Sequence, residues 1–431
     1  MLSLVCRRLS KALPDTLKKS KLNLELNLRP QVADHLEIDL PFSKSIWIRS
    51  SFINALQGIN TRLDTSGQAD DVSLFERAID VVQDQYHFDN AGTPFRFFLA
   101  YKALRGDQCT LDGSPRLRQR PMTSLVKALR DLGAEIECLE EEGFAPIRIK
   151  SGVESGGSIE MDSSESSQPI SALLQIAPYL EGGLEIQLIG TQVSWSYLEQ
   201  TINLMTAAGA EVEVAGTSIR VKEQPYQHSM NALERDWSSA SYWYQFMALR
   251  KSGSIFFPQL HTNGLQGDEV LLEFYKNLGV ETVVSQAGIL IRKVPSHDEH
   301  EPLSFDLSSC PDLGPALMCT FGALRKSARF KGIAHLRLKE SDRIKTIAEQ
   351  MHLLGCTLEY DGSDEVRLRR SEPTEKENFV FDSFGDHRIA MALAACIPLT
   401  GNSKILNAEV VKKSYPKYWD HLNDFAEIKE W

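Results

Sequence analysis

The sequence predicts an α/β protein assembled from copies of one small unit. Four segments share the same pattern: an amphipathic helix, a glycine, an alternating strand, a turn, and a second strand that reads Ile-Arg-Ile or similar. Their glycines, Gly133, Gly209, Gly279 and Gly355, follow one another at intervals of 76, 70 and 76 residues. This period exceeds that of a solenoid repeat, so each copy is expected to be a small α/β subdomain.

The glycine of each copy marks the end of its helix and the beginning of a hairpin. A glycine just past a helix supplies the left-handed conformation that stops the helix. The residues after it alternate with a period of two, which indicates half-buried strands paired as hairpins. The expected hairpins are 134–137 with 147–149, 210–214 with 219–221, 280–283 with 290–292, and 356–359 with 366–368. About six such units would fill the chain, and the outer two, near 50–90 and 395–431, are too degenerate to identify from sequence.

Composition restricts the classes of function. The chain has 431 residues, 42% of them hydrophobic, which suits two or three domains of roughly 150 residues. Its net charge of −11 argues against a general nucleic-acid-binding surface, so an anion site must come from local clustering of Lys and Arg. The seven cysteines include no Cys-x-x-Cys pair, so neither a zinc site nor a disulfide framework is indicated. A protein of the reducing cytoplasm is expected.

The chain shows no apolar run of the roughly 20 residues that a membrane-spanning helix needs. Its N-terminus is basic, because residues 1–20 carry five Lys or Arg and one Asp. A solvated extension is expected there. An organelle-targeting peptide is the alternative, whereas the apolar stretch 2–5 is too short for a secretory signal.

Lys and Arg gather where helices are predicted to begin. Apolar residues follow with helical spacing, as in Ile344, Ile347 and Met351. Prolines in three of the segments suit the first helical position, where a missing N–H costs nothing. The segments are 43–49, 90–96, 118–121, 166–169, 339–343 and 386–388.

Such helix starts indicate an anionic ligand. A helix N-terminus binds anions because its N–H groups are unpaired and its dipole end is positive. The dipole does not favour cations there, so Lys and Arg at six starts suggest that a ligand's negative charge completes the arrangement. A solvent-exposed ion pair is the alternative for any single start. Six starts in an acidic chain favour a small ligand with several anionic groups.

The same segments resemble the 5-enolpyruvylshikimate-3-phosphate synthase family from about residue 24 to the C-terminus. Each motif alone is weak, but their order and spacing are highly specific. The motifs are Pro-x-Ser-Lys-Ser (41–45) with Arg49, Asn-Ala-Gly-Thr-x-x-Arg (90–96), Leu-Asp-Gly-Ser-Pro-Arg-Leu-Arg-Gln-Arg-Pro (111–121), Ser-Ser-Gln (166–168), Asp-x-Ser-Ser-Ala-Ser-Tyr (236–242), Gln-Gly-Asp (266–268), Pro-Asp (311–312), Arg-Leu-Lys-Glu-Ser-Asp-Arg (337–343), Asp-His-Arg-x-Ala-Met (386–391) and Lys-Ser-Tyr-Pro (413–416).

The resemblance implies a fold and its division. The fold is a two-lobed inside-out α/β barrel of the enolpyruvyl transferase kind, with three βαβαββ repeats in each lobe. One lobe is expected at 43–236 and holds mainly the shikimate 3-phosphate site. The other is expected at 1–42 and 237–431, and completes the phosphoenolpyruvate site. A two-stranded hinge would let the lobes close on substrate.

The resemblance also implies an activity. The enzyme would transfer the enolpyruvyl group of phosphoenolpyruvate to the 5-hydroxyl of shikimate 3-phosphate and release phosphate, on the pathway to chorismate and the aromatic amino acids. The reaction would be an addition followed by an elimination through a tetrahedral ketal, with no metal or organic cofactor. A cytoplasmic monomer without nucleic-acid or membrane partners is expected.

Residue roles follow from the resemblance, position by position. Asp312 would take the proton of the attacking hydroxyl, and Glu340 would protonate the methylene carbon and take that proton back. Lys44, Lys413 and His387 complete the catalytic set. The shikimate 3-phosphate site would contain Lys44, Ser45, Arg49, Ser166, Ser167, Ser194, Asp312, His335 and Lys339. The phosphoenolpyruvate site would contain Lys44, Gly92, Arg120, Gln168, Arg343, Arg388 and Lys413. Arg343 and Arg388 would hold the carboxylate of phosphoenolpyruvate by forked hydrogen bonds.

Simpler roles stay open for some of these residues. Glu340 or Asp312 could cap a helix, and His387 could be a packing residue. Core positions are expected for Trp237, Tyr242, Trp243 and Tyr244. The chain departs from the family near the expected shikimate site, so an active enzyme with altered shikimate affinity is the hypothesis. The departures are Phe42, Ile48, Phe97, Trp195, Ser196 and His335.

Two other functions compete with this one. The UDP-N-acetylglucosamine enolpyruvyl transferase has the same fold, but normally carries a Cys in the loop that here, at 111–121, has none; Cys109 lies on a predicted strand. A non-catalytic anion-binding homologue is the second competitor. Asp312 and Glu340 in a cationic pocket count against it, since binding alone does not need them.

Overall fold

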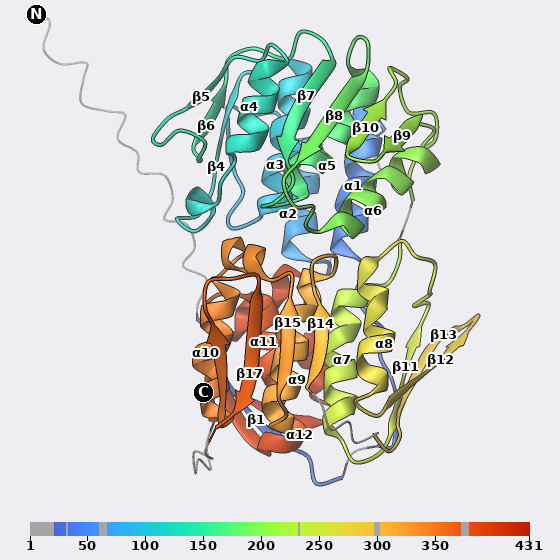
Figure 1. The fold of residues 1–431 in the computed structure, drawn as a ribbon, viewed down its shortest axis with the longest axis vertical. Helices are drawn as coiled ribbons and strands as arrows, with labels where there is room; N and C mark the ends of the chain where they lie inside the picture. The colour runs from blue at the N-terminus through green and yellow to red at the C-terminus, as the bar shows by residue number, and fades with distance from the viewer. Residues whose placement is uncertain (1–20, 32, 60–66, 232, 297–301, 372–378) are drawn as a thin grey trace, which may run out of the picture.

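The structure is a computed structural model. It describes residues 21–31, 33–59, 67–231, 233–296, 302–371 and 379–431. The basic segment 1–20, and with it the targeting alternative, lies outside the described residues. The chain forms two lobes stacked along the long axis of the molecule (Figure 1). The upper lobe has a hydrophobic core of residues between Ile46 and Met230, and the lower lobe has a second core, of residues between Leu24 and Leu40 and between Trp237 and Ala426.

The sheets of both lobes share one strand order. In each, two parallel strands lie at one edge and an antiparallel pair completes the other. The upper sheets are β3 (Gln85–His87), β4 (Cys109–Asp112), β6 (Ile147–Ile149) and β5 (Ile136–Cys138), and β7 (Gly157–Asp162), β8 (Leu184–Ile189), β10 (Ser218–Val221) and β9 (Val212–Ala215). The lower sheets are β2 (His35–Glu37), β11 (Ser254–Pro258), β13 (Gly288–Lys293) and β12 (Val280–Ser285); β14 (Leu303–Asp306), β15 (Ala328–Lys331), β17 (Glu365–Arg370) and β16 (Cys356–Tyr360); and β18 (Phe379–Asp382), β19 (Asn402–Leu406), β1 (Leu24–Leu28) and β20 (Ala426–Glu430).

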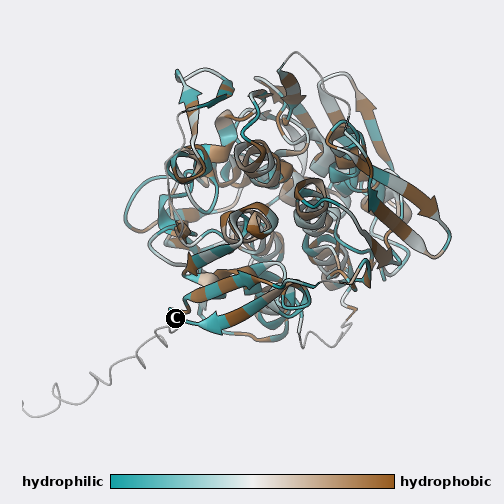
Figure 2. Cartoon of the chain, turned by 90° about the horizontal axis from the view of Figure 1, so that it is seen from below, coloured by the Kyte–Doolittle hydropathy of each residue, from teal (hydrophilic) through white to brown (hydrophobic). Residues whose placement is uncertain are grey.

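Helices fill the interior and the sheets cover them, as the view along the long axis shows (Figure 2). Every residue of α7 (Trp237–Leu249) and of α11 (His387–Ala394) is buried, so neither helix has a face toward solvent. The other helices are α1 (Lys44–Leu56), α2 (Asp70–Asp80), α3 (Gly92–Arg105), α4 (Thr123–Asp131), α5 (Gln168–Ile176), α6 (Trp195–Ala207), α8 (Leu271–Lys276), α9 (Gly314–Leu324), α10 (Arg343–Leu353), α12 (Ile397–Thr400) and α13 (Tyr418–Leu422). Short 3-10 helices are η1 (Leu117–Gln119), η2 (Ala177–Tyr179), η3 (Gly267–Val270), η4 (Pro311–Leu313), η5 (Ala334–Leu338) and η6 (Ala408–Lys413).

The four predicted repeats are confirmed. Helices α4, α6, α8 and α10 are each followed by a glycine with positive φ and then by a hairpin. An exposed-face Glu lies opposite an Arg in every hairpin, a favourable cross-strand pair. The pairs are Glu137–Arg148, Glu213–Arg220, Glu281–Arg292 and Glu359–Arg367. Of the degenerate outer units, 395–431 contributes β19 and β20, and the unit near 50–90 contributes α1 and α2; residues 60–66 between these helices are not described.

The chain passes between the lobes beside β2 and α7. The upper lobe is inserted between these two elements, and β1 joins the sheet of the C-terminal strands β19 and β20. The inside-out α/β barrel expected from sequence is therefore the observed fold. Within the described residues, no helix is both long and apolar enough to cross a membrane.

Candidate active site

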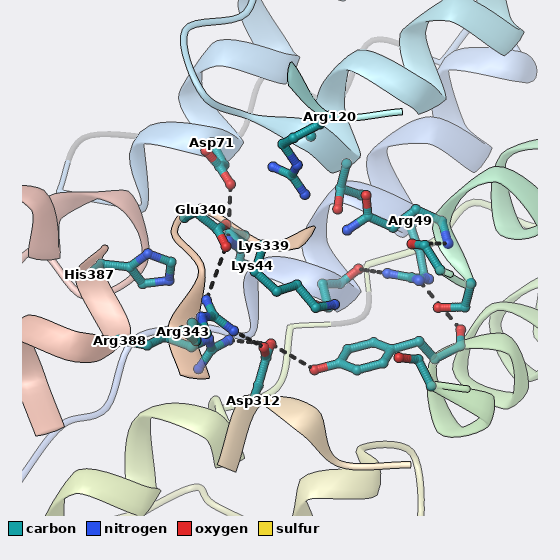
Figure 3. Close-up of a pocket in the computed structure, with 18 residues that line it drawn as sticks. Lys44, Arg49, Asp71, Arg120, Asp312, Lys339, Glu340, Arg343, His387 and Arg388 are labelled. Atoms are coloured by element: carbon teal, nitrogen blue, oxygen red, sulfur yellow. Dashed lines mark hydrogen bonds and ion pairs between the residues drawn. The ribbon is translucent and has the colours of Figure 1, made fainter. Parts of the chain in front are cut away.

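Helices of both lobes begin at the junction between the lobes and line one cavity (Figure 3). Their positive dipole ends and unpaired N–H groups face a common space, which favours anions. The upper lobe contributes Lys44, Ser45, Arg49, Asp71, Gly92, Thr93, Arg120, Ser166, Ser167, Gln168, Ser194 and Tyr197, and the lower lobe contributes Asp312, Lys339, Glu340, Arg343, His387 and Arg388.

The predicted site residues all line this cavity, with two exceptions. Lys413 lies behind Glu340, where its Nζ donates to Glu340 Oε1 at 2.9 Å and to the carbonyl of Asn90 at 2.9 Å. His335 lines an adjacent cavity that shares Lys339 with the first. All six of the predicted helix starts therefore contribute residues to one cavity.

We call the cavity lining from the upper lobe the upper wall and the lining from the lower lobe the lower wall. Arg343 is the centre of an ion-pair network in the lower wall. Its Nη1 lies 3.0 Å from Asp312 Oδ1, and its Nη2 lies 3.0 Å from Glu340 Oε2. Its Nε donates to Asp386 Oδ2 at 2.9 Å. The guanidinium is 1% exposed and the Asp386 carboxylate is fully buried, so helices α10 and α11 are held together at their first residues.

The cations of the network keep both catalytic candidates ionised. Burial alone would raise the pKa of Asp312, but Arg388, whose Nη2 lies 2.5 Å from Oδ2, and Arg343 outweigh it and hold the pKa well below its usual range. Burial would likewise raise the pKa of Glu340, and Lys413 and Arg343 hold it well below the usual value. Both groups are carboxylates as long as these partners stay in place.

The helix caps show that Glu340 does not cap α10. Asp342 caps α10 by accepting from the N–H of Lys345 at 3.2 Å, so the capping alternative for Glu340 is wrong. Asp386 caps α11 by accepting from the N–H of Arg388 at 3.0 Å. The Asp312 carboxylate binds guanidinium groups instead of helix N–H groups.

Two buried arginines of the upper lobe contact neutral oxygens: Arg49 lines this cavity, and Arg96 lines the adjacent one. Arg49 Nε donates to Thr201 Oγ1 at 2.7 Å, and burial lowers the pKa of Arg49 to about 10. Arg96 Nη1 donates to Gln168 Oε1 at 2.8 Å, and burial and the neighbouring Arg120 lower the pKa of Arg96 to about 9. Burial therefore disfavours the charged form of both guanidinium groups, and a second guanidinium adds to this effect at Arg96.

Gly92 and Lys44 also line the cavity from the upper lobe. A Cβ atom at Gly92 would lie 2.5 Å from Arg120 Cζ, so only glycine lets the guanidinium lie against the start of α3. Lys44 Nζ forms an ion pair with Asp71 Oδ2 at 3.0 Å.

The serines and Lys339 form a second side of the cavity. Ser194 adopts a left-handed conformation (φ 56°) at the start of α6, and its N–H donates to the carbonyl of Ser308 in the lower lobe at 2.7 Å. Burial lowers the pKa of Lys339 to about 8. Ser166 and Ser167 precede α5 and lie in the same lining.

The two histidines are neutral. His387 is 1% exposed, and burial and Lys44 lower its pKa well below the usual value. Burial and Lys339 lower the pKa of His335 to about 3. Within the described residues neither ring has a hydrogen-bond partner, and no group of three or more His, Cys, Asp or Glu is placed to hold a metal ion.

Sequence reasoning missed several functional contacts. Tyr197 lines the cavity, and its hydroxyl donates to Asp312 Oδ2 at 3.0 Å across the lobes. The available signal was its position one helical turn after Ser194. Asp71 and Arg96 were likewise given no role, although Arg96 closes a motif that was recognised.

Most departures from the family pattern lie outside the cavity. Ile48 and Phe97 are buried in the upper core, and Phe97 stacks on Phe52 with ring centroids 5.5 Å apart. Phe42 packs under the guanidinium of Arg235, 4.5 Å from its ring centroid, at the junction of the lobes. The predicted core aromatics Trp237, Tyr242, Trp243 and Tyr244 are all at most 1% exposed. An altered shikimate affinity stays a prediction.

The sequence of the chain is similar to those of known proteins. The model of the family described as EPSP synthase (3-phosphoshikimate 1-carboxyvinyltransferase) matches residues 49–422. A protein of Bacteroides fragilis (strain YCH46) named 3-phosphoshikimate 1-carboxyvinyltransferase is 37% identical over 387 residues, which cover 89% of this chain and 94% of the relative. One of the same name from Methanospirillum hungatei JF-1 is 32% identical over 373 residues, 85% of each chain.

Solved structures show the same fold. The EPSP synthase of Acinetobacter baumannii superposes with a TM-score of 0.70 at 18% identity, over 94% of this chain and 100% of that one. The enolpyruvyl transferase NikO of Streptomyces tendae superposes with a TM-score of 0.69 at 14% identity, over 95% and 99%.

Proposed function

Because the chain belongs to the EPSP synthase (3-phosphoshikimate 1-carboxyvinyltransferase) family, we propose that the cavity between its lobes is where the enolpyruvyl group of phosphoenolpyruvate passes to the 5-hydroxyl of shikimate 3-phosphate. The chain is a transferase of the shikimate pathway, which leads to chorismate and the aromatic amino acids. One observation carries the assignment to this cavity: Asp312 and Glu340 share Arg343 inside it. A site that only bound anions would not need two carboxylates.

Phosphoenolpyruvate would lie against the lower wall. Arg343 and Arg388 present adjacent guanidinium groups that can fork onto its carboxylate; each now places one nitrogen against a different oxygen of Asp312. Its phosphate would lie among cations and one amide of both lobes, next to the Arg120 guanidinium that Gly92 allows to lie against the start of α3. These groups are Lys44, Arg120, Gln168 and Lys413.

Shikimate 3-phosphate would lie against the upper wall. Ser45 and Arg49 would hold its carboxylate, and the neutral His335 lies at the edge of its phosphate position. The phosphate would accept hydrogen bonds from Ser166, Ser167, Ser194 and Lys339. Tyr197 and Asp312 would then face the ring hydroxyls.

Substrate binding would prepare the carboxylates for proton transfer. The anionic groups of phosphoenolpyruvate compete for Arg343, Arg388 and Lys413, which now hold the pKa of Asp312 and Glu340 low. Once these cations turn to substrate, burial raises the pKa of both groups toward the range of a working acid and base. Asp312 would take the hydroxyl proton, and Glu340 would protonate the methylene carbon and later accept a proton from it as phosphate leaves.

The lobes are proposed to be 43–236 and 1–42 with 237–431, joined beside Phe42 and Arg235. Two separate cores and the Phe42–Arg235 bridge support this division. A cytoplasmic monomer that acts on small molecules alone is also proposed, because one chain supplies the whole cavity and the six described cysteines are unpaired. Light scattering and cell fractionation test these two points.

An acceptor assay tests the function. Phosphoenolpyruvate is offered with shikimate 3-phosphate or with UDP-N-acetylglucosamine, and phosphate release and the vinyl product are recorded. Turnover with shikimate 3-phosphate alone is expected. Turnover with the nucleotide sugar would favour the other transferase, and binding of both substrates without phosphate release would favour the non-catalytic alternative.

A further inference from the structure

Arg116 of the upper lobe contacts the backbone that carries Lys339 and Glu340. It lies in the loop between β4 and α4, and its Nη2 donates to the carbonyl of Lys339 at 2.8 Å. Its Nε donates to the carbonyl of Glu340 at 3.2 Å, and Nη2 also lies 3.5 Å from the carbonyl of Arg337. One half-buried guanidinium therefore spans three peptide units of the opposite lobe.

The carbonyl of Arg337 lies in the last turn of η5 and those of Lys339 and Glu340 follow its end, where carbonyl groups lack helical partners. A guanidinium presents several donors in a fixed plane, so one side chain can reach adjacent carbonyls from separate nitrogen atoms, whereas a Lys would have to reach them from a single nitrogen. The side chains of the same segment are held from the lower lobe: Glu340 by Arg343, and Ser341 Oγ by Asp386 at 3.1 Å. The segment is thus held by its backbone from above and by its side chains from below.

Hydrogen bonds attach the loop that carries Arg116 to the rest of the upper lobe. The N–H of Ser114 donates to the carbonyl of Asp89 at 2.7 Å, and the N–H of Leu117 donates to Ser114 Oγ at 3.2 Å. Arg120, which lines the cavity, is four residues further on. A ligand that moves the upper lobe toward the lower one through Arg120 therefore brings Arg116 with it.

We propose that Arg116 is a positioning residue: by binding the carbonyls of Lys339 and Glu340 across the cleft, it fixes both side chains in the geometry that the transfer needs when the lobes are closed. The inference rests on the proposed function. Arg116 does not touch the reacting atoms and acts through Glu340.

The matched control lies two residues away. Arg118 is in the same loop, but its guanidinium binds Asp112, with Nη2 2.6 Å from Oδ2, and Glu140, with Nη1 2.7 Å from Oε1, both in the upper lobe. Arg116→Met and Arg118→Met remove the same charge from one loop. Only the first removes contacts between the lobes.

The test measures kcat, KM and the solvent deuterium isotope effect on kcat, because the proton that Glu340 delivers exchanges with solvent. Arg116→Met is expected to lower kcat about tenfold or more, which corresponds to about 1.4 kcal/mol in the barrier, and to raise the isotope effect as proton transfer becomes limiting. Arg116→Lys is expected to recover part of kcat. Arg118→Met is expected to stay within twofold of the wild type in both measurements.

Two results would overturn the proposal. One is an equal loss in Arg116→Met and Arg118→Met. The other is a loss in Arg116→Met with an unchanged isotope effect and a smaller folded fraction by thermal melting, since partial unfolding removes active molecules without changing the step. An inactive wild-type enzyme would instead refute the proposed function, so the two failures are distinguishable.

Discussion

The two walls of the cavity hold their positive charges in different ways. In the lower wall Arg343, Arg388 and Lys413 all lie within 3.0 Å of a carboxylate oxygen of Asp312 or Glu340. In the upper wall Arg49 donates to a hydroxyl and a backbone carbonyl, and the neighbouring Arg96, which lines the adjacent cavity, donates to an amide and backbone carbonyls. Lys44, paired with Asp71, is the upper-lobe exception.

The difference separates two tasks. Neutral oxygens orient a buried guanidinium without cancelling its charge, so the upper wall is ready for an anion, at the cost of lowered pKa values for Arg49 and Arg96. Carboxylates cancel the charge of the lower wall, so an anionic substrate must compete with them. That competition is what allows substrate binding to change the protonation of Asp312 and Glu340.

The largest expected effect comes from a lower-wall carboxylate. Glu340→Gln keeps the shape of the side chain but removes the proton donor, so kcat is expected to fall about 10³-fold, within the range of general acid–base catalysis. Phosphate release at saturating substrates is the measurement. Glu349→Gln, at an exposed position of α10, is the control and should stay within twofold. Similar turnover in both variants would remove Glu340 from the mechanism.

The next test compares stability at two equally buried arginines, Arg343 at 1% and Arg49 at 2% exposure. Arg343→Met leaves the fully buried Asp386 without its cation, so a loss of about 3–5 kcal/mol in the free energy of unfolding is expected. Arg49→Met leaves only neutral acceptors unpaired, so about 1–3 kcal/mol is expected. Urea unfolding of both variants measures the difference, and equal losses would contradict the contrast between the walls.

A smaller effect is expected at Gly92 in the upper wall. In Gly92→Ala the new methyl group would push the Arg120 guanidinium away, because the Cβ would lie 2.5 Å from Cζ. The KM for phosphoenolpyruvate is expected to rise about tenfold, the loss of one charged hydrogen bond. A double-mutant cycle with Arg120→Ala gives the check: Gly92→Ala should have little further effect in that background, and additive effects would show that it acts elsewhere.

The parts of the molecule that sequence predicted are local ones. A helix, its terminal glycine and a hairpin lie within one repeat, so their periodicity was visible, as was the gathering of Lys and Arg at helix starts. Contacts between lobes were not visible: Tyr197 reaches Asp312 and Arg116 reaches Lys339 only after both lobes have folded. Ile48 and Phe97 were expected near the shikimate site. Neither lines the cavity, but the Phe97 ring lies 5.4 Å from the Arg49 guanidinium; because α1 and α3 are buried on nearly all sides, no polar face in the sequence showed which way these side chains point.

The smallest effect concerns Lys339, which lines both the main cavity and the adjacent one. Burial lowers its pKa to about 8, and the nearby His335, with a pKa of about 3, does not titrate in this range. Below pH 8 the free site therefore presents an ammonium, and above it a neutral amine. A phosphate ester is almost fully dianionic above about pH 7, so its affinity is expected to fall by only about twofold from pH 7 to 8, as half of the Lys339 side chains lose their proton.

Above pH 8 the dissociation constant of shikimate 3-phosphate is expected to rise, by at most about tenfold per pH unit, as binding requires uptake of one proton. Calorimetric titrations at pH 7, 8 and 9, in buffers of different ionisation enthalpy, measure both the constant and the proton. Lys339→Arg supplies the control, because a guanidinium stays charged throughout. If the arginine variant shows the same rise, the titrating group is not Lys339, and the charge that the lower lobe offers the phosphate must come from elsewhere.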